Sequence, residues 1–153
     1  MLGLGGFVLL AVSSAFGELE QAVESTARSA WCKGCGVAAQ PHGRRLVRVR
    51  DRPCSGRPVT LLWRKRLWRC AEPACPSRTW SETSQHVRGR ASLTERARRE
   101  ACRLVGEDGL DVAAVATTLG VGWHTVMRAV RDYGTPLIED PARIDGVAAV
   151  GVD

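Results

Sequence analysis

The sequence is poor in aromatic side chains: they make up 5% of the 153 residues, and five of them are tryptophan. This scarcity argues against one large core and favours two or three small modules, which usually need additional stabilisation, for example by a metal ion. An apolar run long enough to span a bilayer is also missing. No basic residue precedes Arg28 and the apolar stretch Phe7–Val12 is short, so a secretory signal is not indicated. We therefore expect a cytoplasmic protein with no membrane partner, in a compartment that keeps thiols reduced.

Acidic residues are almost absent from residues 42–69, which contain ten lysines or arginines and only one acid, Asp51. Ten cations and one acid give this segment a net charge of +9, whereas the whole chain has a formal charge of +6. Such segregation of charge points to a polyanionic partner. The cations alternate with Val, Leu and Trp in extended segments and not along an amphipathic helix, which favours nucleic acid over a membrane surface. The candidate DNA contacts of this segment are Arg44, Arg45, Arg48, Arg50, Arg64, Lys65, Arg66 and Arg69.

Four of the six cysteines form two close pairs at the ends of this basic segment. The first pair is Cys32-Lys-Gly-Cys35, and the second, Cys70-Ala-Glu-Pro-Ala-Cys75, follows after thirty-four residues. Two short loops can each direct two sulfurs at one point, so the spacing predicts a structural Zn²⁺ ion bound by all four thiolates. A redox pair or thiols without metal are the alternatives. A thiol oxidoreductase would place its CxxC motif beside a βαβ pattern, and no such pattern follows Cys35.

The other candidate ligands lie apart from these pairs. Cys54 is at a turn far from both of them and is expected to be a spare thiol, whereas Cys102 falls in a helical pattern and is expected in a core. His42 could replace one cysteine, but the set of four is complete without it. Trp80, which follows the second pair, is expected to seal that loop and not to stack on a base.

Four strands are predicted before and between the two cysteine pairs. Phe7–Val12 and Leu19–Glu24 are typical of a hairpin that precedes the first cysteine pair. Arg44–Arg50 and Val59–Trp68 predict a second hairpin, reversed by the Pro and Gly within residues 53–56. Because this second hairpin joins the two cysteine pairs, the pattern is that of a zinc ribbon with an exposed basic surface.

Three helices are predicted in the part of the chain after residue 91. The first, residues 92–105, begins with a capping box formed by Ser92 and Glu95. The second and third cover residues 111–119 and 123–133, with two glycines in the break between them.

The second and third helices fit the pattern of a helix-turn-helix. That motif needs a small residue where the helices cross, a glycine at the turn and a branched apolar residue inside the second helix, and Ala116, Gly120 and Val126 supply these. A generic helical hairpin is the plainer alternative, but the capped helix before it and the basic neighbour favour DNA binding. Arginines are the first candidates for reading bases, since Arg can bind guanine bidentately. The outward residues of the third helix are His124, Thr125, Arg128 and Arg131.

The expected fold class is therefore α+β. We expect a β-hairpin in residues 1–30, a zinc-ribbon finger with basic strands in residues 31–81, a helix-turn-helix module in residues 92–134, a linker in residues 135–145 and a single terminal strand in residues 146–153.

With these residues, the chain resembles the N-terminal region of bacterial insertion-sequence transposases of the ISL-three family over nearly its whole length. The segments that carry the resemblance are WCKGCG, HGRR.VRVRD.PC.GRPV, LLWRKRLWRC, CAEPACPSRTW, VAAVATTLGVGWHTVMRAVRDYG and DPARIDGVAAVGVD. The resemblance implies that the zinc finger and the helix-turn-helix recognise the terminal inverted repeats of the element as double-stranded DNA. It also implies a location in the bacterial cytoplasm, associated with the nucleoid.

The same resemblance implies a following RNase H-like catalytic domain, in which an Asp, Asp, Glu set holds Mg²⁺ to cut and join DNA. Asp153 matches the first of these carboxylates, at the end of the first catalytic strand. The second Asp and the Glu are absent from this sequence, and two-metal phosphoryl chemistry needs several carboxylates. We therefore interpret the chain as a truncated DNA-binding fragment, inactive as an enzyme by itself. A stand-alone zinc-ribbon and helix-turn-helix transcription regulator is the alternative, because the same residues would serve both.

Overall fold

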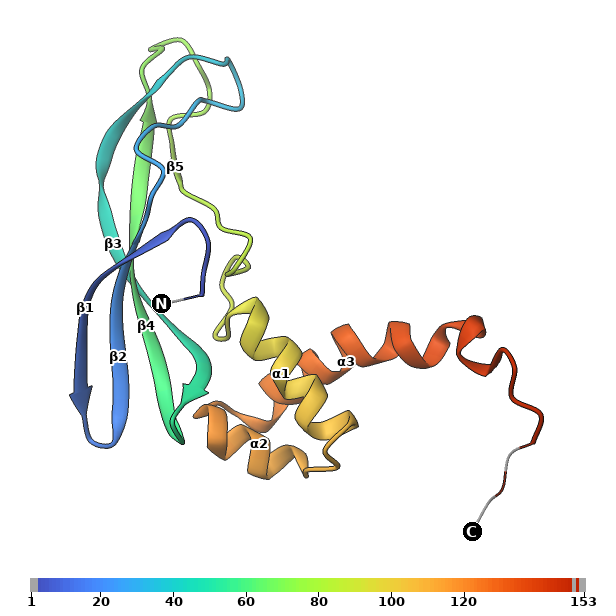
Figure 1. Ribbon diagram of the computed structural model, residues 1–153. Coiled ribbons are helices and arrows are strands. Elements are labelled where there is room, and N and C mark those ends of the chain that lie inside the picture. The colour runs from blue at the N-terminus through green and yellow to red at the C-terminus, as the bar shows by residue number, and fades with distance from the viewer. Residues whose placement is uncertain (1–2, 150, 152–153) are drawn as a thin grey trace.

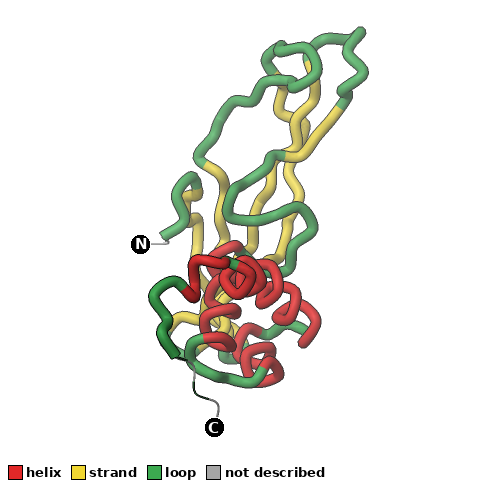
Figure 2. Tube along the Cα trace, turned by 90° about the vertical axis from the view of Figure 1, so that its right-hand side faces the viewer, coloured by secondary structure: helices red, strands yellow, loops and turns green. Residues whose placement is uncertain are grey.

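The computed structural model describes residues 3–149 and 151, and within them the chain is an α+β protein with a five-stranded sheet and three α-helices. The sheet is tall and narrow, and the helices lie beside its lower half (Figure 1). Seen from the side, the helices lie in front of the lower ends of the strands, while loops close the opposite end (Figure 2). The predicted fold class is confirmed.

Two antiparallel hairpins build the sheet, as predicted. The first consists of β1 (Phe7–Ala15) and β2 (Glu18–Ser25), and the second of the longer β3 (Ala39–Cys54) and β4 (Arg57–Cys70). The strand order is β1-β2-β4-β3, with β2 running parallel to β4. The short β5 (Thr79–Ser81) pairs with the last part of β4.

Alternate residues of β3 and β4 form much of the core of the sheet. Val49 lies opposite Leu61 in the ladder, Val47 lies opposite Trp63, and Val49, Leu61 and Trp63 are buried. Phe7 meets the Trp63 ring edge-to-face at a centroid distance of 5.4 Å. Because side chains alternate between the two faces of a strand, the other face carries Arg44, Arg48, Arg50, Arg64 and Arg66. Arg45 and Lys65 share the apolar face, beyond Val47 and Trp63.

The helices are α1 (Glu95–Gly106), α2 (Val112–Leu119) and α3 (Trp123–Glu139). Asp111 caps α2 by accepting hydrogen bonds from two backbone amides, and Gly120 ends it in the left-handed conformation, at φ 64°. The core of this helical module contains the apolar positions predicted for a helix-turn-helix. Its buried members are Leu93, Ala97, Ala101, Val115, Ala116, Leu119, Val126 and Ala129.

The predicted capping box of α1 is wrong, because the cap is Thr94 and not Ser92. The Thr94 hydroxyl accepts from the Ala97 amide. Ser92 is held in an extended conformation, since its carbonyl accepts from the Arg50 amide and the Thr94 amide donates to the Arg50 carbonyl. The helix can therefore begin only after this pairing with the edge of β3 ends.

The same contact fixes the helical module to the sheet. Asp51 is 1% exposed and accepts hydrogen bonds from the Thr94 hydroxyl at 2.6 Å and from Arg96 Nε at 2.8 Å. A buried carboxylate with a cationic partner and a hydroxyl donor ties α1 to β3.

Two features of the described C-terminal part differ from the expected pattern. The linker expected in residues 135–145 is largely structured, because α3 continues to Glu139 through Pro136 and a 3₁₀ turn covers Pro141–Ile144. Residues 136–139 are exposed, so backbone groups left without an intrahelical partner by the proline can be hydrated. The expected terminal strand is not formed by residues 147–149 and 151, which are exposed and lie beside no strand of the described sheet. Asp153 lies outside the described residues.

None of the helices in the described part of the chain is long and apolar enough to cross a membrane.

Candidate metal centre and nucleic-acid interface

The two cysteine loops meet at the end of the sheet that lies away from the helices. The Sγ atoms of Cys32, Cys35, Cys70 and Cys75 all lie within 4.8 Å of one another, with 3.7 Å between Cys32 and Cys75 and 3.5 Å between Cys35 and Cys70. Sulfurs in a tetrahedron around a zinc ion at about 2.3 Å would be roughly 3.8 Å apart. The four cysteines could therefore bind a metal such as zinc with only small shifts of their sulfurs.

The two loops are in close contact. A Cβ atom at Gly34 would lie 2.9 Å from the Ser77 hydroxyl oxygen, so a larger residue there would push the loops apart. Trp80 packs against the buried cysteines, as predicted. This packing shields one side of the cluster from water.

The cysteine cluster does not favour four thiolates by itself. The backbone amides of Cys35 and Gly34 donate to the Cys32 sulfur and lower the pKa of Cys32 to about 6. Burial raises the pKa of Cys70 to about 12. One thiolate is thus stabilised by the loop and another is opposed by desolvation, and a bound cation would supply the missing charge compensation.

The other thiols and His42 lie away from the cluster. Cys54 is exposed at the β3–β4 turn, and Cys102 is partly buried in α1 with its sulfur 3.9 Å from the Val130 carbonyl oxygen. His42 is exposed on β3. Of the described residues, only the four predicted cysteines form this cluster.

The predicted basic strands are partly neutralised by carboxylates on β2, a feature that the sequence analysis missed. Glu24 Oε1 lies 2.8 Å from Arg44 Nε, and the same carboxylate is within 3.5 Å of Arg64 and 3.4 Å of Arg66. Two more ion pairs of 2.6 Å join β2 to β3, namely Glu20 with Arg48 and Glu18 with Arg50. The alternation of glutamates in β2 was visible, but their partners depend on the parallel pairing of β2 with β4.

Three of the predicted strand cations have no carboxylate partner among the described residues: Arg45, Lys65 and Arg69. Arg45 and Lys65 lie directly opposite each other on β3 and β4. The Lys65 ammonium lies 4.6 Å from the Trp63 ring centroid, and burial together with the charge of Arg45 lowers the pKa of Lys65. Adjacent cations that repel each other would gain from a phosphate between them.

Arg50 connects the sheet to the helix-turn-helix. Its guanidinium donates to Glu18 and to the Thr60 hydroxyl, and it would lie only 3.0 Å from a Cβ atom at position 120. Gly120 is therefore required both for its left-handed conformation and for the close approach of Arg50. A hollow of about 300 Å³ lies at this junction, lined in part by Arg48, Arg50 and Thr125. The start of α3 thus adjoins the charged face of the sheet.

The orientation of α3 agrees with the predicted register. Val126 and Ala129 are fully buried against α1 and α2, whereas His124, Arg128 and Arg131 are exposed and Thr125 is half-buried. Sequence reasoning missed Trp123, which is 46% exposed at the first position of α3 and meets the His124 ring edge-on. The signal available in the sequence was a tryptophan at the first position of the third predicted helix.

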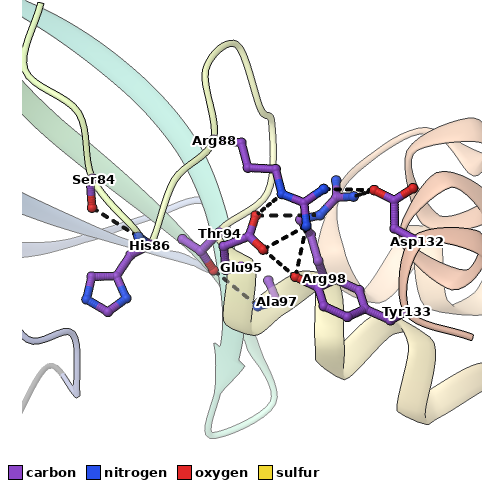
Figure 3. Close-up of polar contacts among 9 residues, drawn as sticks. All are labelled: Ser84, His86, Arg88, Thr94, Glu95, Ala97, Arg98, Asp132 and Tyr133. Carbon is purple, nitrogen blue, oxygen red and sulfur yellow. Dashed lines mark hydrogen bonds and ion pairs between the residues drawn. The ribbon is translucent and has the colours of Figure 1, made fainter. Parts of the chain in front are cut away.

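A cluster of charged and polar side chains holds α3 against α1 (Figure 3). Arg88, from the loop before α1, lies 2.7 Å from Glu95 and 2.9 Å from Asp132. The buried Arg98 also pairs with Asp132, and the Tyr133 hydroxyl donates to Glu95. These contacts fix the direction in which the exposed side of α3 points.

Comparison with known proteins gives one match to this arrangement. Residues 82–134 match the family model described as the helix-turn-helix domain of transposase family ISL3, written ISL-three above. The matched segment includes the Arg88 loop, α1, α2 and the first two thirds of α3. No curated protein and no solved structure matches the chain.

Proposed function

We propose that the chain recognises the double-stranded terminal inverted repeats of an insertion sequence, on the premise that residues 82–134 match the helix-turn-helix domain of transposase family ISL3. The observation that carries the proposal is the orientation of α3. Its apolar side is buried in the helical core, and Arg128 and Arg131 are exposed together on the other side. A helix supported in this way can enter the major groove and present guanidinium groups to base edges.

The proposal assigns Zn²⁺ to the four-cysteine cluster. Thiolate ligands and tetrahedral spacing favour zinc over hard cations such as Mg²⁺. A site in which protein sulfurs fill all four positions leaves none open for substrate, so its role is structural. The ion would hold together the two loops at the end of β3 and β4.

The sheet contributes affinity that does not depend on sequence. The cations proposed to meet phosphates are Arg45, Lys65 and Arg69, because the other predicted strand arginines already contact carboxylates of β2. Arg45 and Lys65 lie on the face of Val47 and Trp63, opposite to the face whose Arg48 and Arg50 adjoin Thr125 at the start of α3. No cutting or joining step is assigned to the described residues, and the role of Asp153 stays an expectation from the resemblance.

Footprinting of the encoding locus tests this function. The chain should protect bases within the inverted repeats at both ends of the element. Protection at a promoter, with none at the element ends, would support a transcription regulator and contradict the proposal.

Replacing Arg45, Lys65 and Arg69 together by alanine should flatten the salt dependence of duplex binding. Each phosphate contact contributes about −0.9 to the slope of log K against log salt, so the loss of three contacts should change the slope by roughly 2.7. The slope is measured by fluorescence anisotropy with a random duplex over a series of salt concentrations.

The matched control replaces Arg44, Arg48 and Arg64, which are also exposed strand cations but contact carboxylates. It removes the same formal charge and should change the slope much less. A larger change in the control than in the test variant would show that the ion pairs with β2 open on DNA.

A further inference from the structure

An open groove lies between the metal loops and the helical module. Its volume is about 920 Å³, within the range of roughly 300–1,000 Å³ that is usual for ligand sites. Its walls are the segment that leaves β2, residues 25–33, and the segment that contains β5, residues 76–86. The Ser25 hydroxyl donates to Glu82 at 2.5 Å and so joins the two walls. Both segments run between the metal loops and the middle of the sheet (Figure 1).

The groove combines exposed aromatic surface with positive charge. Trp31 lines it and is 66% exposed, and Trp80 lines it in a partly buried position. Lys33 and Arg78 are exposed on the same lining and have no ion pair among the described residues. A ligand with both a flat ring and a negative charge would match these four side chains.

The acid in the groove does not oppose such a ligand. Of the described residues that line the groove, Glu82 alone is acidic. Its carboxylate already accepts from the Ser25 hydroxyl, from Trp63 Nε1 at 3.1 Å and from the Arg66 amide at 2.8 Å. These three donors compensate its charge, so the lining is cationic on balance.

We propose that this groove binds single-stranded nucleic acid, with an unpaired base stacked on Trp31 and the adjoining phosphates at Lys33 and Arg78. An aromatic platform next to cations is the general arrangement of single-strand binding sites. A duplex keeps its bases stacked on one another and offers no free base face to a tryptophan in a concave site. The site is separate from α3, and the proposal does not depend on the recognition of inverted repeats.

The test compares two exposed tryptophans on two DNA probes. In the full chain, Trp31→Ala should weaken binding to a short oligothymidylate about tenfold or more, because stacking on one aromatic side chain contributes strongly per base. Its affinity for a blunt random duplex should change by less than about twofold. Trp123→Ala, which alters the exposed tryptophan of α3, is the matched control and should leave oligothymidylate binding unchanged.

Two further variants separate stacking from misfolding. Trp31→Phe should restore most of the oligothymidylate affinity, and metal content should be equal in all variants. Lys33→Ala with Arg78→Ala should reduce the salt slope for oligothymidylate by about 1.4, from roughly 0.7 per contact. The proposal is overturned if the wild-type chain does not bind oligothymidylate or if Trp31→Ala binds it with wild-type affinity. It is also overturned if Trp31→Ala loses affinity for oligothymidylate and for the duplex by the same factor.

Discussion

Removal of the metal is expected to unfold the two cysteine loops, residues 31–38 and 70–78, while the core of the sheet and the helical module keep their structure. Metal binding in four-ligand sites of this kind contributes on the order of 10–16 kcal/mol, which equals or exceeds the whole stability of a small domain. The two cysteine loops have little else to hold them, since Trp80 is the one apolar side chain packed on their cluster among the described residues. The helical module has a separate core around Leu93 and Val126. Hydrogen exchange after chelation should therefore show lost protection in the cysteine loops and retained protection in the middle of β3 and β4 and in α1–α3.

Cysteine variants provide the matched control for metal removal. Cys70→Ser with Cys75→Ser should abolish metal binding, because both sulfurs lie in the cluster. Cys54→Ser should leave one metal ion per chain, because this thiol is exposed at the β3–β4 turn. Metal content is measured on protein purified under reducing conditions. A wild-type chain without metal, or the double variant with metal, would contradict the assignment.

Val126→Asp is expected to unfold the helical module and leave the metal site intact. Val126 is 0% exposed in the core formed by all three helices, and a carboxylate there would have no cationic partner in that core. Burial of an unpaired charge costs several kcal/mol, enough to exceed the stability of a module of this size. Far-UV circular dichroism should show the loss of helix, and metal content should stay at the wild-type value.

His124→Asp is the control for this substitution on the same helix. His124 is exposed in the first turn of α3, where an acidic residue is compatible with the helix dipole. This variant should keep the wild-type helix content and unfolding midpoint. A fully folded Val126→Asp protein would show that the α2–α3 interface is not the packed core described above.

The sequence was sufficient for features that depend on local pattern. The alternation around Val47 and Val49 predicted β3, the spacing of Ala116, Gly120 and Val126 predicted the α2–α3 turn, and the cysteine spacing predicted the cluster. Each of these signals lies within a short stretch of chain or in a ligand set with strict geometry. These features can therefore be predicted without knowledge of the tertiary fold.

Features that depend on contacts between segments far apart in the sequence could not be predicted from local pattern. The parallel contact of β2 with β4 brings Glu24 to three arginines, although nothing near Glu24 in the sequence indicates it. The cap of α1 moves from Ser92 to Thr94 because Ser92 pairs with β3. Glu95, expected to close a capping box, instead contacts Arg88 and Tyr133. In each case a tertiary partner displaces the local one.

The central claim, that α3 reads the ends of an insertion sequence, is tested most directly by one comparison of affinities. The chain is titrated with a duplex that carries the inverted repeat and with a random duplex of equal length, at one fixed salt concentration. The account predicts tighter binding to the repeat by about a thousandfold or more. Arg128→Ala should lose about 1–3 kcal/mol on the repeat and far less on random DNA. Equal affinity of the wild-type chain for both duplexes would contradict the account.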